Sequence, residues 1–253
     1  MTDNAIREAA ELIFRARSTV ALSGAGISVD SGIPDFRSPG GLWERFDPMD
    51  YAHISSFMEN PARVWRMLDE IHDVVLKAKP NPGHQALAEL EAMGRLDAVI
   101  TQNIDNLHQE AGSKQVIEFH GNSKRLVCLS CLFSYPSEKV TFKPGKPPRC
   151  VCGAILKPDI VFFGEAIPPF AYHRALELAG HAEAMLVVGT SAQVAPSNML
   201  PGITRANGGT IIEVNVGSTS LTAMPNVFHL NGSASEMLPR LVREVRRIAA
   251  EGA

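Results

Sequence analysis

Short apolar runs alternate with amphipathic stretches along most of the chain. Apolar residues recur at helical spacing over 5–16 and again over 241–248, which predicts a helix close to each terminus. Four apolar runs have the length and composition of buried strands: 20–22, 98–100, 185–188 and 210–214. This alternation of strand and helix patterns predicts an α/β fold with a Rossmann-like parallel sheet.

All four cysteines of the 253-residue chain fall in one short stretch, as the pairs Cys128/Cys131 and Cys150/Cys152. Two close pairs of thiolates complete the tetrahedral shell of a zinc ion. Four sulfur ligands leave no open coordination position, so we expect a structural zinc ion rather than a catalytic one. Two disulfides are the alternative, and the cytoplasmic location argued below favours zinc.

The cysteine stretch interrupts the rhythm of strands and helices. We therefore expect a small zinc-ribbon module, residues 123–154, inserted into a discontinuous Rossmann-like domain that comprises residues 1–122 and 155–253.

Composition and charge narrow the possible function classes. The chain is 45% hydrophobic and 20% charged, and no apolar run reaches the roughly 18 residues of a membrane helix. Acidic residues close to the N-terminus do not fit a secretory signal, so we expect a cytoplasmic protein without membrane contact. The net charge of -3, without clustered basic residues, disfavours direct nucleic-acid binding.

Glycine and polar residues follow the predicted strands. Gly24 and Gly26 come after the first run, residues 101–105 after the second, residues 189–191 after the third and Asn215 after the fourth. Ligands of open parallel sheets bind beyond the carboxyl ends of the strands. Paired glycines also let backbone N–H groups approach a pyrophosphate. Each motif alone is compatible with an ordinary turn or cap, but together they predict a ligand site.

A conventional dehydrogenase is disfavoured. The third glycine of the dinucleotide-binding fingerprint would fall at Val29, and no acidic residue convincingly supplies the ribose ligand about 20 residues further on.

Longer motifs give a specific resemblance. In chain order they are Gly24-Ala25-Gly26-Ile27-Ser28, Gly32-Ile33-Pro34-Asp35-Phe36-Arg37, Thr101-Gln102-Asn103-Ile104-Asp105-Asn106-Leu107-His108, His120-Gly121, the cysteine pairs, Val161-Phe162-Phe163-Gly164-Glu165 and Gly189-Thr190-Ser191. With these motifs the chain resembles the sirtuin (Sir2) family, of prokaryotic type, over about residues 24 to 215. The resemblance implies an NAD-dependent protein-lysine deacetylase or deacylase, an enzyme of the acyltransferase class, whose Rossmann-like domain binds NAD.

The family reaction gives three residues a catalytic role by resemblance. Sirtuins cleave nicotinamide from NAD and transfer the acyl group to ADP-ribose, which yields O-acyl-ADP-ribose, nicotinamide and free lysine. The resemblance implies that His120 is the general base, which suits a side chain that titrates near neutral pH. It also implies that Asn103 orders the ribose and a water molecule, and that Asp105 holds the nicotinamide carboxamide. We expect the remaining histidines to be structural.

The resemblance also implies the binding residues. Those expected to bind NAD are Gly24, Ala25, Gly26, Ile33, Asp35, Phe36, Arg37, Gln102, Asn103, Ile104, Asp105, His120, Gly189, Thr190, Ser191, Asn215, Val216 and Ala234. Those expected to bind an acylated-lysine protein or peptide, which would pair as an added strand, are Val161, Phe162, Phe163, Gly164 and Val194. The expected metal ligands are Cys128, Cys131, Cys150 and Cys152.

The helix after Asn60-Pro61 bears on the choice of acyl group. The sirtuins that remove succinyl or malonyl groups carry a Tyr and an Arg three residues apart on this helix, whereas residues 64–71 contain no tyrosine here. Acidic acyl groups are therefore disfavoured, because an unpaired buried carboxylate is costly. We expect Arg66 to lie in solvent, and Met67 and Leu68 to pack.

Two alternatives stay open. A protein mono-ADP-ribosyltransferase would cleave NAD in the same way but modify a protein nucleophile. A non-catalytic interaction module would bind NAD without releasing nicotinamide, although the presence of His120, Asn103 and Asp105 argues against it.

Overall fold

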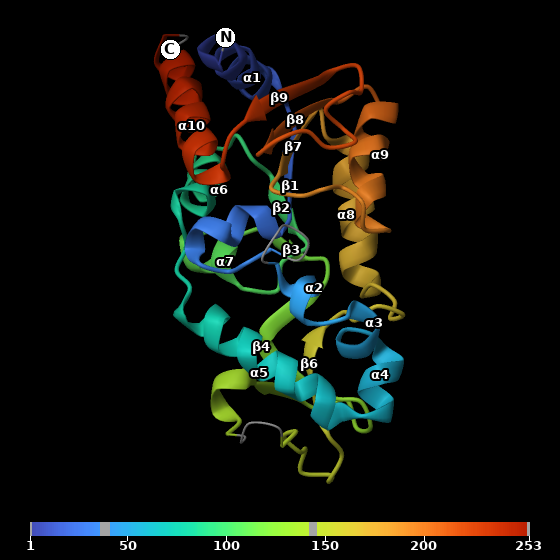
Figure 1. Ribbon diagram of the computed structural model, residues 1–253. Helices are drawn as coiled ribbons and strands as arrows, with labels where there is room; N and C mark the ends of the chain where they lie inside the picture. Colours follow the sequence, from blue (N-terminus) through green and yellow to red (C-terminus); the bar gives the residue numbers. More distant parts are fainter. Residues whose placement is uncertain (1, 36–40, 142–145, 252–253) are drawn as a thin grey trace.

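The four apolar runs predicted as strands lie side by side in one parallel sheet (Figure 1). In the computed structural model, which describes residues 2–35, 41–141 and 146–251, the strands of this sheet are β1 (Thr19–Ser23), β2 (Ala98–Thr101), β3 (Val116–Glu118), β7 (Ala184–Val188), β8 (Thr210–Asn215) and β9 (Val227–Asn231). Their order across the sheet is β3-β2-β1-β7-β8-β9. In the centre, Val20 is aligned with Ala98 on one side and Met185 on the other.

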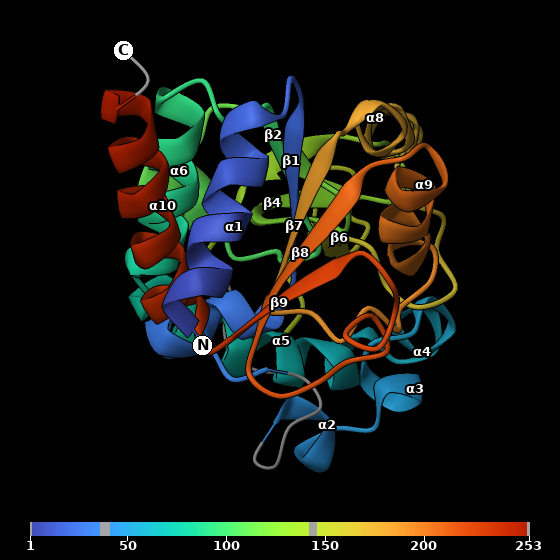
Figure 2. The same cartoon turned by 90° about the horizontal axis from the view of Figure 1, so that it is seen from above.

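Helices cover both faces of this sheet (Figure 2). One face carries α1 (Thr2–Arg15), α6 (Pro82–Ala92) and α10 (Ala234–Glu251), and the other carries α8 (Pro169–His181) and α9 (Leu200–Ala206). On β1, Ala21 packs into the first layer of helices, whereas Val20 and Leu22 pack into the second. Because both faces of the strand are buried, its sequence is an uninterrupted apolar run rather than an alternating one.

The two helices predicted near the termini are confirmed as α1 and α10, and they share one core. Ile6 and Ile13 of α1 and Leu241 and Val245 of α10 are all buried in the same hydrophobic cluster. Their spacing places them on one face of each helix, so burial of these faces against the sheet stabilises both helices.

A second, antiparallel sheet forms a smaller lobe. Its strands are β4 (Gly121–Cys128), β5 (Ser134–Pro136) and β6 (Leu156–Ile160), in the order β5-β4-β6. An earlier part of the chain adds α2 (Leu42–Arg45), α3 (Pro48–Tyr51), α4 (Ile54–Glu59) and α5 (Pro61–Lys77). Trp65 of α5 packs with Leu126 and Leu156 of the sheet and donates a hydrogen bond of 3.0 Å from Nε1 to the Leu156 carbonyl oxygen. The smaller lobe thus combines two separate segments, as Figure 1 shows.

The remaining short elements are α7 (Leu107–Ala111) and the 3₁₀ helices η1 (Ala25–Ser31), η2 (Ser137–Lys139) and η3 (Ser197–Met199). Across the described residues, no helix combines the length and the apolar character required to cross a membrane.

Candidate active site

A cavity of about 490 Å³ lies at the carboxyl ends of the parallel strands, facing the smaller lobe. Residues 24–26 follow β1, residues 102–104 follow β2, residues 189–191 follow β7, and Asn215 and Val216 mark the end of β8; all of them line this cavity. The structure therefore brings together the four strand-end motifs that the sequence separates, at the edge where parallel sheets bind ligands.

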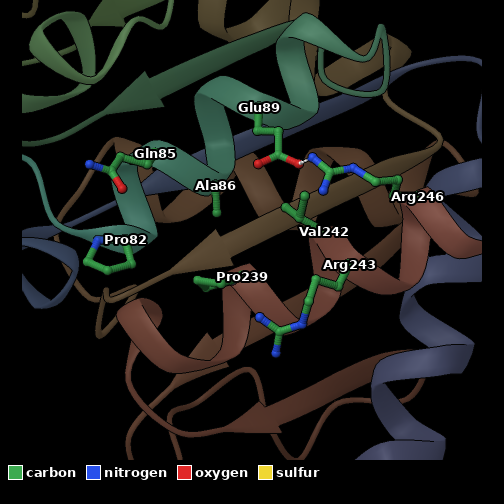
Figure 3. A pocket seen from close by; sticks show the side chains of 8 residues that line it. All are labelled: Pro82, Gln85, Ala86, Glu89, Pro239, Val242, Arg243 and Arg246. Carbon is green, nitrogen blue, oxygen red and sulfur yellow. Dashed lines mark hydrogen bonds and ion pairs between the residues drawn. The ribbon is translucent and has the colours of Figure 1, made fainter.

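A shallower depression of about 180 Å³ lies between α6 and α10 (Figure 3). Its lining includes Ala86 and Val242 and the ion pair between Glu89 and Arg246. No histidine, cysteine or strand-end residue is among the described residues that line it. The chemistry that the sequence predicts therefore lies in the larger cavity.

The turns after β1 and β7 touch each other through glycine. Gly26 N–H donates to the Gly189 carbonyl oxygen at 2.8 Å. A Cβ atom at Gly189, which has a φ of 58°, would lie 2.3 Å from Ile27 N, and one at Gly26 would lie 2.8 Å from Gly189 Cα. Both positions need glycine because the two backbones pass too close for a side chain.

His120 is held as a neutral base on the cavity wall. Its Nδ1 atom lies 3.0 Å from the carbonyl oxygen of Gln102. Since a carbonyl oxygen only accepts, Nδ1 carries the hydrogen atom, and the Nε2 lone pair remains available. Burial lowers the pKa of His120 below its ordinary value of 6.5, and the hydrogen bond to Gln102 opposes this shift. The imidazole is thus prepared to accept a proton near neutral pH.

Asn103 and Asp105 are joined through Ser28. Ser28 Oγ donates to Asp105 Oδ2 at 2.7 Å, and Asn103 Nδ2 donates to Ser28 Oγ at 3.1 Å. The other carboxylate oxygen, Oδ1, accepts from Leu107 N–H at 2.9 Å. Asn103 lines the cavity, whereas Asp105 is 5% exposed and lies behind the lining. This network fixes the orientation of the Asn103 amide.

Two histidines are buried behind the same network. His84 Nε2 lies 3.4 Å from Ser28 Oγ, and His108 Nε2 lies 2.8 Å from Ser23 Oγ. Burial lowers the pKa of His84 to about 4, against the attraction of Asp105, and the pKa of His108 to about 3, where the charge of His84 adds to the effect. Both rings are therefore neutral at pH 7 and serve as hydrogen-bonding and packing groups.

The four cysteine sulfur atoms are grouped as zinc requires. They all lie within 4.8 Å of one another, and the Cys128–Cys152 and Cys131–Cys150 sulfur distances are both 3.5 Å. Sulfurs bound tetrahedrally at 2.3 Å from zinc are about 3.8 Å apart, so the four thiolates fit this ion. All four cysteines are free thiols in this structure, and their grouping around one point favours a zinc site over two separate disulfides.

The expected substrate residues Val161, Phe162, Phe163, Gly164 and Val194 all line the cavity. Much of the backbone of this segment is already paired within the chain. Phe163 N–H donates to the Ala52 carbonyl at 2.9 Å, and the Phe163 carbonyl accepts from Ile54 N–H at 3.0 Å. Within the described residues, Gly164 N–H has no partner. Added-strand pairing by a peptide is thus restricted to the few groups that remain free.

Among the expected NAD-binding residues that the structure describes, three are not in the lining: Ile33, Asp105 and Ala234. Ile33 is buried beside Leu107, and Ala234 is buried as the first residue of α10. Phe36 and Arg37 lie outside the described residues.

Asp105, discussed above, is also behind the lining. The other expected residues at this end, Asp35, Gln102, Ile104, Thr190 and Ser191, line the cavity with the strand-end glycines.

The cavity lining includes apolar side chains that sequence reasoning did not assign to the site. Among them are Trp43, Met67, Leu68 and Ile71. Met67 and Leu68 are 3% and 6% exposed and pack into the core of the smaller lobe, as expected, and Arg66 on the same helix is exposed. The apolar period of α5 was visible in the sequence, but only the fold shows that its buried face also borders the cavity.

Comparison with known proteins gives consistent similarities. A model of the Sir2 family matches residues 24–196. The NAD-dependent protein deacylase 2 of Pyrobaculum aerophilum is 46% identical over 243 residues, which cover 94% of this chain and 95% of that protein.

Solved structures agree with these sequence similarities. A mutant Sir2 homologue in complex with ADP-ribose superposes with a TM-score of 0.92 at 41% identity, covering 96% of this chain and 97% of the other. A Sir2 variant with a deacetylated p53 peptide and 3'-O-acetyl-ADP-ribose gives a TM-score of 0.89 at 39% identity, covering 94% and 98%.

Proposed function

Because the chain belongs to the Sir2 family, we propose that NAD and an acyl-lysine substrate react in the cavity between its two sheets. The protein is an NAD-dependent protein deacylase. Acyl-lysine, NAD and one water molecule are converted into free lysine, nicotinamide and O-acyl-ADP-ribose. NAD supplies a ribose carbon that becomes electrophilic when nicotinamide leaves.

The observation that carries the catalytic assignment is the contact between His120 Nδ1 and the Gln102 carbonyl oxygen. It leaves Nε2 as the proton acceptor on the cavity wall. We assign His120 as the general base that takes a proton from a ribose hydroxyl and so allows the acyl group to migrate. General-base help of this kind is typically worth about 10² to 10⁴ in rate.

We assign Asn103 and Asp105 the role of positioning the nicotinamide riboside part of NAD. The Asn103 amide is oriented by Ser28 and by the Gly24 carbonyl oxygen, to which Nδ2 donates at 3.2 Å. This supports a role in ordering the ribose. The Asp105 carboxylate, fixed by Ser28 and Leu107, is the proposed holder of the nicotinamide carboxamide. Because Asp105 lies behind the residues that line the cavity, this role requires those residues to move locally.

The apolar side chains that α5 contributes to the cavity lining support a neutral acyl group. Leu68 and Ile71, three residues apart on α5, offer neither the hydroxyl nor the cation that a carboxylate-bearing acyl chain would need. An acidic group placed there would be buried without a cation.

The zinc ion is structural, and we propose residues 123–154 as its module, set within a NAD-binding domain of residues 1–122 and 155–253. Four thiolate ligands must stay reduced to hold the metal, which supports action in a reducing compartment such as the cytoplasm. The sequence has no cluster of Lys and Arg residues that would bind nucleic-acid phosphates. The proposed partners are therefore acylated proteins or peptides rather than nucleic acid.

Mass spectrometry of an acetyl-lysine peptide tests this function directly. The peptide is incubated with the protein with or without NAD, and with the His120→Ala variant. We expect loss of the acetyl group, and formation of O-acetyl-ADP-ribose, only with NAD and only with His120 present. ADP-ribose attached to the peptide or the protein, with the acetyl group retained, would instead establish the ADP-ribosyltransferase. NAD binding without nicotinamide release on any acyl peptide would establish the interaction module.

A further inference from the structure

A buried lysine lies directly behind the segment of residues 160–165, which lines the cavity on the side of the smaller lobe. Lys157, on β6, has a side chain only 3% exposed. Lysine is almost never fully buried unless its charge is paired, so the groups that contact Lys157 indicate its role.

The ammonium group of Lys157 contacts both ends of this segment. Nζ donates to the Ile160 carbonyl oxygen at 2.5 Å, where the segment begins. It also lies 2.9 Å from Glu165 Oε2, where the segment ends. The Phe162 ring lies between these two contacts, with its centroid 4.5 Å from Nζ. A single cation thus connects the first, third and last residues of the segment.

Glu165 extends this connection to the backbone. Its Oε2 atom accepts from Phe162 N–H at 2.8 Å, and its own N–H donates to the Phe162 carbonyl oxygen at 3.0 Å. The carboxylate therefore fixes the turn that presents Phe163 and Gly164 at the cavity. Hydrogen bonds to a charged group are stronger than neutral ones, so the turn depends on the ionised state of the pair.

The environment makes the lysine and the glutamate interdependent. Burial lowers the pKa of Lys157, and the Glu165 carboxylate opposes this shift. Removal of one partner from a buried ion pair leaves an uncompensated charge, whereas replacement of both is often tolerated. The segment should therefore rearrange when either charge is lost.

We propose that Lys157 is a positioning residue for the acyl-lysine substrate, because it fixes residues 160–165 in the conformation against which the peptide binds. This inference rests on the proposed function of the cavity. None of the contacts of Lys157 reaches the strand-end residues 24–26, 102–104 or 189–191. Its loss should therefore weaken peptide binding and leave the nucleotide side intact, whereas a merely structural lysine would affect both sides together.

Three variants separate these roles. Lys157→Met keeps the length of the side chain and removes the charge, and Glu165→Gln keeps an acceptor for Phe162 N–H while it removes the opposite charge. Lys124→Met is the matched control, because Lys124 forms an ion pair with Glu110 at 3.2 Å but does not line the cavity. Each is assayed for the KM of an acetyl-lysine peptide and for the Kd of ADP-ribose.

We expect Lys157→Met to raise the peptide KM at least about tenfold with the Kd of ADP-ribose within about twofold of wild type. Glu165→Gln should raise the peptide KM by a smaller factor, again with the ADP-ribose Kd within about twofold of wild type. Lys124→Met should change neither constant by more than about twofold. A peptide KM within twofold of wild type in Lys157→Met overturns the proposal, as does a rise in the ADP-ribose Kd that parallels the rise in KM.

Hydrogen exchange of the fragment that contains residues 160–165 gives a readout independent of turnover. This fragment should exchange several-fold faster in Lys157→Met, while fragments from β1 and β7 keep their wild-type rates. Unchanged exchange in the fragment contradicts the proposal. If the wild-type protein deacylates no peptide, the proposed function fails, and the exchange measurement still decides whether Lys157 fixes the segment.

Discussion

The Nδ1 atom of His120 lies 3.0 Å from the carbonyl oxygen of Gln102, and the Gln102 side chain in turn donates to Thr190 Oγ1 at 3.0 Å. A single residue thus fixes the tautomer of the proposed base and joins the ends of β2 and β7. The base is positioned by the same backbone that forms the cavity, so its orientation follows from the sheet rather than from a flexible loop.

The pH dependence of the rate should report this environment. Burial lowers the pKa of His120 below 6.5, and the base is active only when neutral. The rate is therefore expected to be flat across neutrality and to fall about tenfold per pH unit only below the lowered pKa. kcat/KM measured between about pH 4.5 and 8.5 checks this. An acid limb centred above pH 7 would contradict it, once assays returned to neutral pH have shown that the protein survives each condition.

Specificity for the acyl group should be switched from α5. The double variant Leu68→Tyr/Ile71→Arg supplies a hydroxyl and a cation on the α5 side of the cavity, where the wild-type side chains leave an acidic acyl group unpaired. We expect the ratio of kcat/KM for succinyl-lysine over acetyl-lysine peptides to rise at least about tenfold.

Arg66→Ala is the matched control for that switch, because Arg66 is exposed on the same helix. It should leave the ratio unchanged. A wild-type protein that already prefers the succinyl peptide would refute the argument from the apolar lining.

Loss of zinc should destabilise the side of the cavity formed by the smaller lobe. Cys128 and Cys150 are buried in the same cluster as Trp65 and Leu156, so the metal site and α5 share a core. We expect chelation, or Cys150→Ser, to lower the unfolding midpoint by roughly 10 °C, because a structural zinc contributes several kcal/mol and each shifts the midpoint by roughly 2–4 °C.

Mass spectrometry measures the loss of zinc, and tryptophan emission measured on the same samples reports the environment of Trp65. The emission should shift to the red as Trp65 loses its hydrogen bond to the Leu156 carbonyl. A zinc-free protein with an unchanged midpoint would show that the cysteines are not needed for this core.

The parts of the fold that the sequence could predict are those set by local patterns. The central strands are buried on both faces, so they read as apolar runs such as 185–188, and their polar ends converge because parallel strands finish at one edge. The zinc site could likewise be predicted from the sequence, because the spacing of the cysteine ligands is a local property. His120 was identified by its motif, and its tautomer required the structure.

The packing of the smaller lobe could not be predicted from local sequence patterns. The apolar face of α5 indicates a helix, but which sheet it covers depends on packing between segments about 60 residues apart, such as Trp65 against Leu126. For the same reason the pattern did not reveal that Leu68 lines the cavity, or that Lys157 is buried. Motif transfer likewise did not show that Asp105 lies behind the lining.

The buried histidine pair should make the protein acid-sensitive. His84 and His108 have folded-state pKa values of about 4 and about 3, below the ordinary 6.5, so the unfolded chain binds more protons at intermediate pH. The free energy of unfolding therefore has its full value above pH 6.5 and decreases as the pH falls toward 4. For His84 alone the decrease is on the order of 3 kcal/mol. Urea unfolding at pH 7 and pH 4.5 measures the loss.

Two variants identify the histidines as its source. His108→Gln keeps a hydrogen-bonding group near Ser23 but cannot titrate, so the difference in unfolding free energy between the two pH values should shrink. His181→Gln, an exposed site where Nδ1 contacts the Glu177 carbonyl at 2.8 Å, should keep the wild-type difference. If His108→Gln retains the full pH dependence, the titration of His108 does not contribute to the acid sensitivity of the protein.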